Sequence, residues 1–134
     1  MFPYTEEPQV LVIDDVPATR LILKDMLSEI GFHTIAEASD GREALEKLKR
    51  HRAQLIICDH VMKDMSGLDL LDQLRNHPYL VDIPFILVSA CREVSLIDTA
   101  LELGADDYIP KPISFELFKR KVIDVAVRRA ASVS

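Results

Sequence analysis

The most constraining feature of this sequence is the alternation of short apolar runs with amphipathic stretches. Each run predicts a strand, and each is followed by a stretch with helical periodicity. Because the first, third and fourth runs are almost entirely aliphatic, they suit parallel strands that are covered by helices on both faces. With right-handed crossovers, we predict an α/β fold built on a doubly wound (βα)5 parallel sheet. The runs are VLVID (10–14), HTIAEA (33–38), LIIC (55–58), FILVS (85–89) and DYI (107–109).

Helix start and stop signals support this alternation. Pro17 stands near the start of the first expected helix, and Gly31 follows its end. The second and third helices are each preceded by a pair with capping-box spacing. These pairs are Asp40 with Glu43, and Ser66 with Asp69.

The length of 134 residues is that of one domain, long enough to bury a core of its own. We expect the domain to span residues 9–128. Residues 1–8 are expected to be an N-terminal lead-in, and residues 129–134 a C-terminal tail or the start of a linker.

Composition argues against several function classes. The net charge of −6 disfavours direct nucleic-acid binding, and the local basic residues near the C-terminus are interpreted as a solvated helix face. Cys58 and Cys91 form no CxxC pair, so neither a disulfide framework nor a zinc site is expected. No apolar run approaches the roughly 20 residues that a membrane span needs. A cytoplasmic protein that does not enter the membrane is therefore expected.

Polar residues gather where the predicted strands end. Asp14 and Asp15 close the first strand, Asp59 follows the third, Ser89 ends the fourth, and Lys111 comes just after the fifth. Each aspartate alone has an ordinary explanation as a turn or cap residue. Because the carboxyl ends of parallel strands meet at one edge of a sheet, all five side chains are expected on one rim.

Three crowded carboxylates repel one another and are the oxygen ligands that Mg²⁺ prefers. With the metal bound, one carboxylate can attack phosphorus and form an aspartyl phosphate. The metal and a lysine would then offset the charge on the phosphoryl oxygens, and Ser89 would donate a hydrogen bond.

Four motifs along the chain resemble those of response-regulator receiver domains, which act in two-component phosphorelays. They are VLVIDD at 10–15, D-x-x-M-x-x-M-S-G at 59–67, VSA at 88–90 and GADDYIPKP at 104–112. They occur in the order and spacing of that family over roughly residues 9–128. The resemblance implies a flavodoxin-like sheet with strand order 2-1-3-4-5.

The resemblance also implies roles at the site. Asp59 would be the phosphoacceptor. Asp15 would bind Mg²⁺ directly and Asp14 largely through water, with the backbone carbonyl of Val61 as a further ligand. In addition, Ser89 and Lys111 would hold the phosphoryl group.

Two further residues take roles from the same resemblance. Tyr108 would be the switch residue that turns inward when Ser89 is drawn to the phosphate. An aromatic residue that merely covers a sheet edge is the alternative explanation for Tyr108. The bond before Pro112 would be cis, a state that is accessible mainly before proline.

The sequence departs from the family pattern in the loop after Asp59. Lys63 stands where many receivers have proline, and it is interpreted as a solvated loop residue. Val61 and Cys91 occupy the positions two residues after Asp59 and Ser89, and neither suits the orientation of an attacking water. We therefore predict slow self-dephosphorylation. We expect the side chain of His60 to point away from the site, since neighbouring strand residues face opposite directions. Cys58 is expected to pack in the core.

The predicted function is that of a phosphoacceptor module, not of an enzyme that turns over an external metabolite. A histidine kinase or phosphotransfer protein would donate the phosphoryl group, and the fourth helix, last strand and fifth helix would present the output surface. The output domain or target is unknown, and the fifth helix is a candidate homodimer face. Two alternatives stay open. One is a haloacid-dehalogenase-like phosphohydrolase, which needs D-x-D after the first strand, and the other is a phosphorylation-independent interaction domain.

Overall fold

The computed structural model describes the backbone of residues 8–133 and the side chains of residues 8–128. Five strands and five helices alternate along the chain. The strands are β1 (Val10–Ile13), β2 (Ile35–Ala38), β3 (Leu55–Asp59), β4 (Phe85–Ser89) and β5 (Asp107–Pro110). The helices are α1 (Pro17–Ile30), α2 (Gly41–Arg50), α3 (Gly67–Arg75), α4 (Val94–Glu102) and α5 (Phe115–Val133).

The strands form one parallel sheet in the order β2-β1-β3-β4-β5. This order confirms the doubly wound, flavodoxin-like α/β fold. The chain winds one way from β1 to β2 and the other way from β3 to β5, so the winding direction reverses between β1 and β3. Ligands of such sheets bind beyond the carboxyl ends of the strands at this position.

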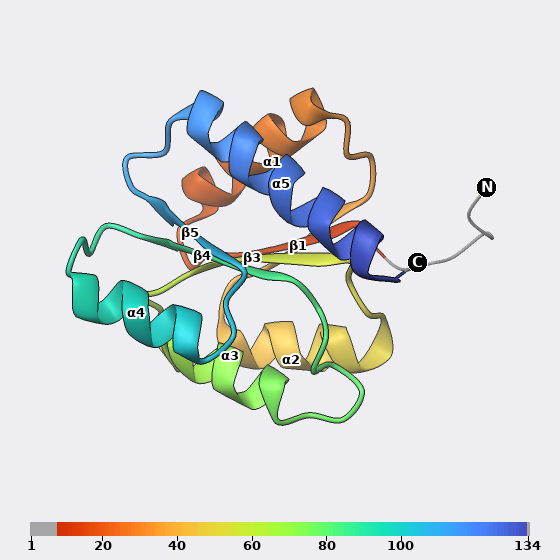
Figure 1. Ribbon diagram of the computed structural model, residues 1–134, viewed down its shortest axis with the longest axis vertical. Helices are drawn as coiled ribbons and strands as arrows, with labels where there is room; N and C mark the ends of the chain where they lie inside the picture. Colours follow the sequence, from red (N-terminus) through yellow and green to blue (C-terminus); the bar gives the residue numbers. More distant parts are fainter. Residues whose placement is uncertain (1–7, 134) are drawn as a thin grey trace.

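The sheet lies between two helical layers (Figure 1). One layer consists of α1 and α5, and the other consists of α2, α3 and α4. Each layer covers its own cluster of buried apolar side chains. Leu23, Leu27, Phe118 and Val122 belong to the first cluster, whereas Leu48, Leu71 and Ala100 belong to the second. Burial of both faces explains why the central strands are aliphatic along their whole length.

Local signals in the sequence set most helix ends. Pro17 is the first residue of α1, and Gly31 follows the helix with a φ of 124°, which favours glycine. Ser66 and Asp69 form a complete capping box at α3. At α2 only half of the expected box forms: Asp40 accepts the hydrogen bond from the Glu43 N–H, while the Glu43 carboxylate accepts one from Ser39 instead.

In the C-terminal segment, α5 continues through residues 129–133. No glycine or proline interrupts the run from Phe115 to Val133, so nothing in the sequence ends the helix earlier. Residues 1–7 of the expected lead-in lie outside the described residues. Within residues 8–133, none of the helices is long and apolar enough to cross a bilayer.

Candidate functional site

Three aspartates meet at the carboxyl edge of the two central strands. Asp14 and Asp15 follow β1, and Asp59 is the last residue of β3. One carboxylate oxygen from each lies within 4.8 Å of the others. Only 1% of Asp14 and 8% of Asp59 is exposed to solvent. Buried carboxylates at this separation repel, and their hard oxygen atoms fit a small divalent cation such as Mg²⁺.

Lys111 brings a positive charge to this group. Its Nζ lies 3.0 Å from Oδ1 of Asp59 and 3.4 Å from Oδ2 of Asp14, although it is 97 residues from Asp14 in the sequence. We call Asp14, Asp15, Asp59 and Lys111 the rim cluster. One ammonium faces three carboxylates, so the cluster keeps an excess of negative charge.

Burial and the neighbouring charges both act on the pKa values of Asp59 and Lys111. Burial and the neighbouring charge of Asp14 raise the pKa of Asp59 above its ordinary value of 3.8, and the bond from Lys111 offsets only part of the rise. Burial by itself would lower the pKa of Lys111. The hydrogen bond to Asp59 and the charges of Asp59 and Asp14 outweigh burial, so the Lys111 pKa lies above its ordinary 10.5.

The backbone around Asp14 is held by two contacts that position its carboxylate. The N–H of Val16 donates to Oδ1 of Asp14 at 2.9 Å. The Nη1 of Arg20 donates to the Asp14 carbonyl at 2.6 Å. Arg20 was not among the candidates from the sequence, because an arginine in the second turn of a helix carries no signal of what it reaches.

Ser89 and Tyr108 are joined by a hydrogen bond at the same edge of the sheet. Ser89 is buried, and its Oγ accepts the N–H of Cys91 at 3.0 Å. The Tyr108 hydroxyl donates to the carbonyls of Ser89, at 3.2 Å, and Cys91. Tyr108 is thus buried against the β4–α4 loop, and burial raises the pKa of its phenol. The Lys111 N–H donates to the Ser89 carbonyl at 2.9 Å, and the Lys111–Pro112 peptide bond is cis.

Two features hold the β3–α3 loop against the rest of the protein: hydrogen bonds of Asp64 and the close approach of Gly67 to β3. The Asp64 carboxylate accepts the N–H of Gly41 at 3.2 Å and of Arg42 at 2.8 Å, so it binds the start of α2. A Cβ on Gly67 would lie 2.6 Å from the Asp59 carbonyl, which explains glycine there. Lys63 and Val61 are exposed, Val61 by 71%. The sequence alone does not indicate the role of Asp64, because its partners lie more than 20 residues away along the chain.

Two neighbours of Asp59 stay out of the rim cluster. Among the described residues, no hydrogen bond or ion pair joins the ring of His60 to an aspartate, and its enclosed Nδ1 has no polar partner. Cys58 is fully buried in the apolar cluster under α2, α3 and α4. Burial raises the pKa of its thiol well above its usual range, which fits the expected packing role.

Comparison with known proteins agrees with this geometry. The family model described as "Response regulator receiver domain" matches residues 10–123. The chain is 39% identical over 123 residues to a protein of Porphyridium aerugineum named "Probable transcriptional regulator ycf27", covering 92% of this chain and 50% of that protein. It is 35% identical over 115 residues to chemotaxis protein CheY1 of Helicobacter pylori, covering 85% of this chain and 93% of that protein. The chain thus spans about half the length of the first relative.

A solved structure extends the similarity to three dimensions. The signal receiver domain of a signal transduction histidine kinase from Syntrophus aciditrophicus superimposes with a TM-score of 0.81 at 32% identity. The match covers 90% of each chain. The proteins most similar to this chain therefore include both a protein not much larger than a receiver domain and larger proteins that contain one.

Proposed function

The chain belongs to the response regulator receiver domain family, and from this premise we propose that Asp59 accepts a phosphoryl group from a phosphohistidine. The observation that carries the proposal is the position of Asp59. It ends the central strand β3, is almost enclosed, and lies 3.0 Å from the Lys111 ammonium within a cluster of three carboxylates. A buried carboxylate beside a fixed cation is suited to attack an anionic phosphoryl group.

The rim cluster also supports a Mg²⁺ site. Asp15 would be a direct ligand and Asp14 largely a water-mediated one, with Asp59 and the Val61 carbonyl completing the protein ligands. When bound, the ion would offset negative charge on the carboxylates and on the phosphoryl oxygens.

In the transfer step, a carboxylate oxygen of Asp59 forms a bond to phosphorus. The bond from phosphorus to the histidine nitrogen breaks, and this nitrogen keeps the electron pair and takes up a proton. Lys111 would leave its ion pair with Asp59 to hold a phosphoryl oxygen, and the Ser89 hydroxyl would donate to another. The protein assists its own phosphorylation and dephosphorylation and has no external metabolite as substrate.

Tyr108 is proposed to report the phosphorylation state to the output surface. Its hydroxyl donates to the Ser89 carbonyl, so a movement of Ser89 toward the phosphate would change the tyrosine's partners. The output surface would consist of the exposed faces of α4, β5 and α5, where Val94, Leu101 and Val127 are apolar and exposed. Phosphorylation would shift a population that exists already.

The partners follow from this assignment. A cytoplasmic histidine kinase or phosphotransfer protein would supply the phosphoryl group, and an output domain or target protein would bind the α4–β5–α5 surface. The α5 helix is the candidate dimer face. The comparisons support neither a haloacid-dehalogenase-like phosphohydrolase nor a phosphorylation-independent domain, and the five polar site residues from Asp14 to Lys111 are all present.

The test is phosphorylation with acetyl phosphate and Mg²⁺, followed by intact mass spectrometry. We expect the native chain to gain about 80 daltons, the mass of one phosphoryl group. The Asp59→Asn variant should gain none, while Asp98→Asn, which replaces an exposed aspartate on α4, should react like the native chain. A gain that survives in Asp59→Asn would refute the assignment.

A further inference from the structure

The N-terminus of α2 is bound by a residue from a different part of the chain. The first N–H groups of a helix have no partner within the helix, and an N-cap side chain usually satisfies only one of them. At α2 the N-cap Asp40 accepts the Glu43 N–H at 2.8 Å. The N–H groups of Gly41 and Arg42 donate instead to the Asp64 carboxylate, at 3.2 and 2.8 Å. The start of the helix is therefore shared between its own cap and the β3–α3 loop.

Asp64 uses both carboxylate oxygens for these bonds. Its Oδ1 accepts the N–H groups of Gly41 and Met65, and its Oδ2 accepts that of Arg42. Burial by itself would raise the pKa of Asp64, but backbone hydrogen bonds, first those from Arg42 and Gly41, outweigh it and hold the pKa below the ordinary 3.8. The carboxylate is therefore ionised at neutral pH, and its hydrogen bonds are charge-assisted.

An apolar contact lies beside these hydrogen bonds. Met65 packs so closely on Gly41 that a Cβ on the glycine would lie 2.4 Å from the methionine Cγ and 2.6 Å from its Sδ. Glycine at this position thus lets the loop lie directly against the helix. Two adjacent loop residues, one polar and one apolar, therefore bind to the first turn of α2.

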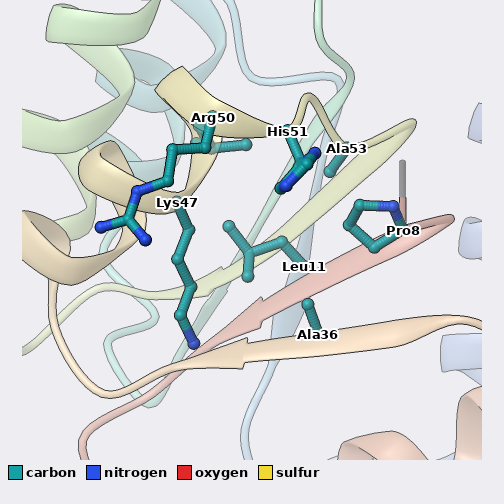
Figure 2. Close-up of a pocket in the computed structure, with 8 residues that line it drawn as sticks. Pro8, Leu11, Ala36, Lys47, Arg50, His51 and Ala53 are labelled. Carbon is teal, nitrogen blue, oxygen red and sulfur yellow. The ribbon is translucent and has the colours of Figure 1, made fainter. Parts of the chain in front are cut away.

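The α2 helix is itself held against the sheet. Ala44 and Leu48 bury one side of the helix in the apolar cluster. Figure 2 shows the pocket between the second half of α2 and the sheet, where the Lys47 side chain reaches from the helix to β2. The Lys47 ammonium donates there to the Glu37 carbonyl. A loop that is bound to α2 is therefore tied to the sheet as well.

Residues 61–63 are held by what precedes and follows them. Before them, the His60 N–H donates to the Val88 carbonyl at 3.1 Å. Within the part of the chain that the structure describes, the backbone of residues 61–63 itself makes no hydrogen bond. No proline in this segment fixes a φ angle. Since only Met62 packs against the apolar cluster, the next polar restraint on the segment is Asp64.

We propose that Asp64 is a positioning residue for the Mg²⁺ site: by binding the β3–α3 loop to α2, it holds the Val61 carbonyl in place before the ion binds. The inference rests on the proposed function, in which this carbonyl is a metal ligand. A free loop would have to lose conformational entropy when the ion binds, and this loss would weaken binding. With the Asp64 hydrogen bonds in place, the loop is already ordered when the ion arrives.

Titration with Mg²⁺, followed by amide NMR signals, tests the proposal. Asp64→Ala should weaken Mg²⁺ binding about threefold or more, because the loop is no longer ordered in advance. Asp64→Asn removes the same negative charge but keeps a side-chain oxygen that can accept the N–H groups of α2. At 0.15 M salt, where charges are screened beyond about 8 Å, it should stay within about twofold of the native affinity.

Asp40→Ala is the matched structural control. It removes a capping hydrogen bond from the same helix end, and one negative charge, but leaves the contacts of the loop with α2 intact. Its Mg²⁺ affinity should stay within about twofold of native, although its melting temperature should fall.

A second readout needs no metal. In the metal-free protein, NMR relaxation of the amides of residues 61–63 should give lower order parameters in Asp64→Ala than in the native chain. Asp64→Asn and Asp40→Ala should resemble the native chain in this measurement. This result depends on the loop alone, so it separates a change in loop order from a change in metal affinity.

Three results would overturn the proposal. Equal affinities of Asp64→Ala and the native protein would mean that the loop needs no restraint. An equal loss in Asp64→Asn would assign the effect to charge, and an equal loss in Asp40→Ala would assign it to the stability of α2. These failures differ from a failure of the proposed function, in which the native chain itself would bind no Mg²⁺ and gain no phosphoryl group.

Discussion

Two charged clusters lie near the carboxyl edge of the sheet, and they carry opposite excess charges. The rim cluster has three carboxylates for one ammonium. In the second, the Glu37 cluster, a single carboxylate lies 2.9 Å from both the Arg20 guanidinium and the Lys24 ammonium. Hydrogen bonds from Lys24 and Arg20 lower the pKa of Glu37, whereas burial raises that of Asp59. The pKa values of two carboxyl groups thus shift in opposite directions, because their burial and their number of cationic partners differ.

The difference separates an ion pair whose charges are matched from the cluster to which we assign the phosphoryl chemistry. The Glu37 cluster is complete, since its carboxylate has two cationic partners and is partly hydrated. The rim cluster is incomplete, because its buried carboxylates outnumber the cations that the described residues place beside them. It would therefore gain most from an added cation, and in the proposed reaction an incoming phosphoryl group would interact with both Lys111 and that cation.

The largest expected effect is on phosphorylation after removal of the rim ammonium. Lys111→Met should slow phosphorylation by acetyl phosphate about 10²-fold, because a fixed charge that faces the transferring oxygens is lost. Lys24→Met removes an ammonium from the Glu37 cluster and should leave the rate within about twofold of native. The initial rate of mass gain measures both. Equal effects of the two variants would mean that the clusters do not differ in function.

The next effect is on metal binding. Asp14→Asn should weaken Mg²⁺ binding at least about tenfold, because a negative charge beside the ion is lost while the bond from the Val16 N–H can remain. Glu37→Gln should change the affinity less than about twofold. Titration of Mg²⁺ followed by amide NMR signals gives both values. If Asp14→Asn bound Mg²⁺ as tightly as the native protein, Asp14 would not be part of the metal site.

A smaller effect is expected on the lifetime of the phosphorylated protein. The native half-life should be minutes or longer, since the exposed Val61 offers no polar group to orient an attacking water. Val61→Asn should shorten it several-fold, whereas Lys63→Asn, in the same exposed loop, should not. The decay of the mass addition after removal of the phosphodonor measures this. A native half-life of seconds would contradict the prediction.

The smallest effect is on the stability of the metal-free protein, and its sign differs between the clusters. The folded-state pKa of Asp59 is raised, so its contribution to stability is present below pH 3.8 and is lost as the pH rises through the folded-state value. At neutral pH the ionised carboxylate therefore destabilises the fold. Asp59→Asn should raise the melting temperature by about 2–8 °C, and this gain should disappear toward pH 3.8.

Glu37 provides the opposite control. Its folded-state pKa is lowered, so its stabilisation is present above pH 4.5 and is lost as the pH falls through the folded-state value. Glu37→Gln should lower the melting temperature slightly at neutral pH, and the loss should shrink in acid. Melting curves between pH 4 and pH 7 would show the two trends. A higher melting temperature for Glu37→Gln, or a lower one for Asp59→Asn, would contradict the expected difference between the two clusters.

Much of the site could be predicted because its parts are local in sequence. Asp14, Asp59 and Ser89 each end an aliphatic run, and parallel strands bring such ends to one edge. The contacts of Arg20 and Asp64 could not be predicted. Each joins segments from different parts of the fold, and polar side chains at a surface have many alternative partners. Only half of the capping box predicted for Asp40 and Glu43 forms, because Ser39 and Lys47 compete for the Glu43 carboxylate.

The sequence by itself determined the order of strands and helices and the residue types at the carboxyl edge, because hydrophobic periodicity and capping act over a few residues. Only the tertiary structure decided which charges meet. It brought the Lys111 ammonium to within 3.4 Å of the Asp14 carboxylate and placed the Arg20 guanidinium and the Lys24 ammonium 2.9 Å from the Glu37 carboxylate. The physical reason is that the energy of an ion pair depends on the distance between its charges and on their burial in three dimensions, and neither quantity is written in the linear chain.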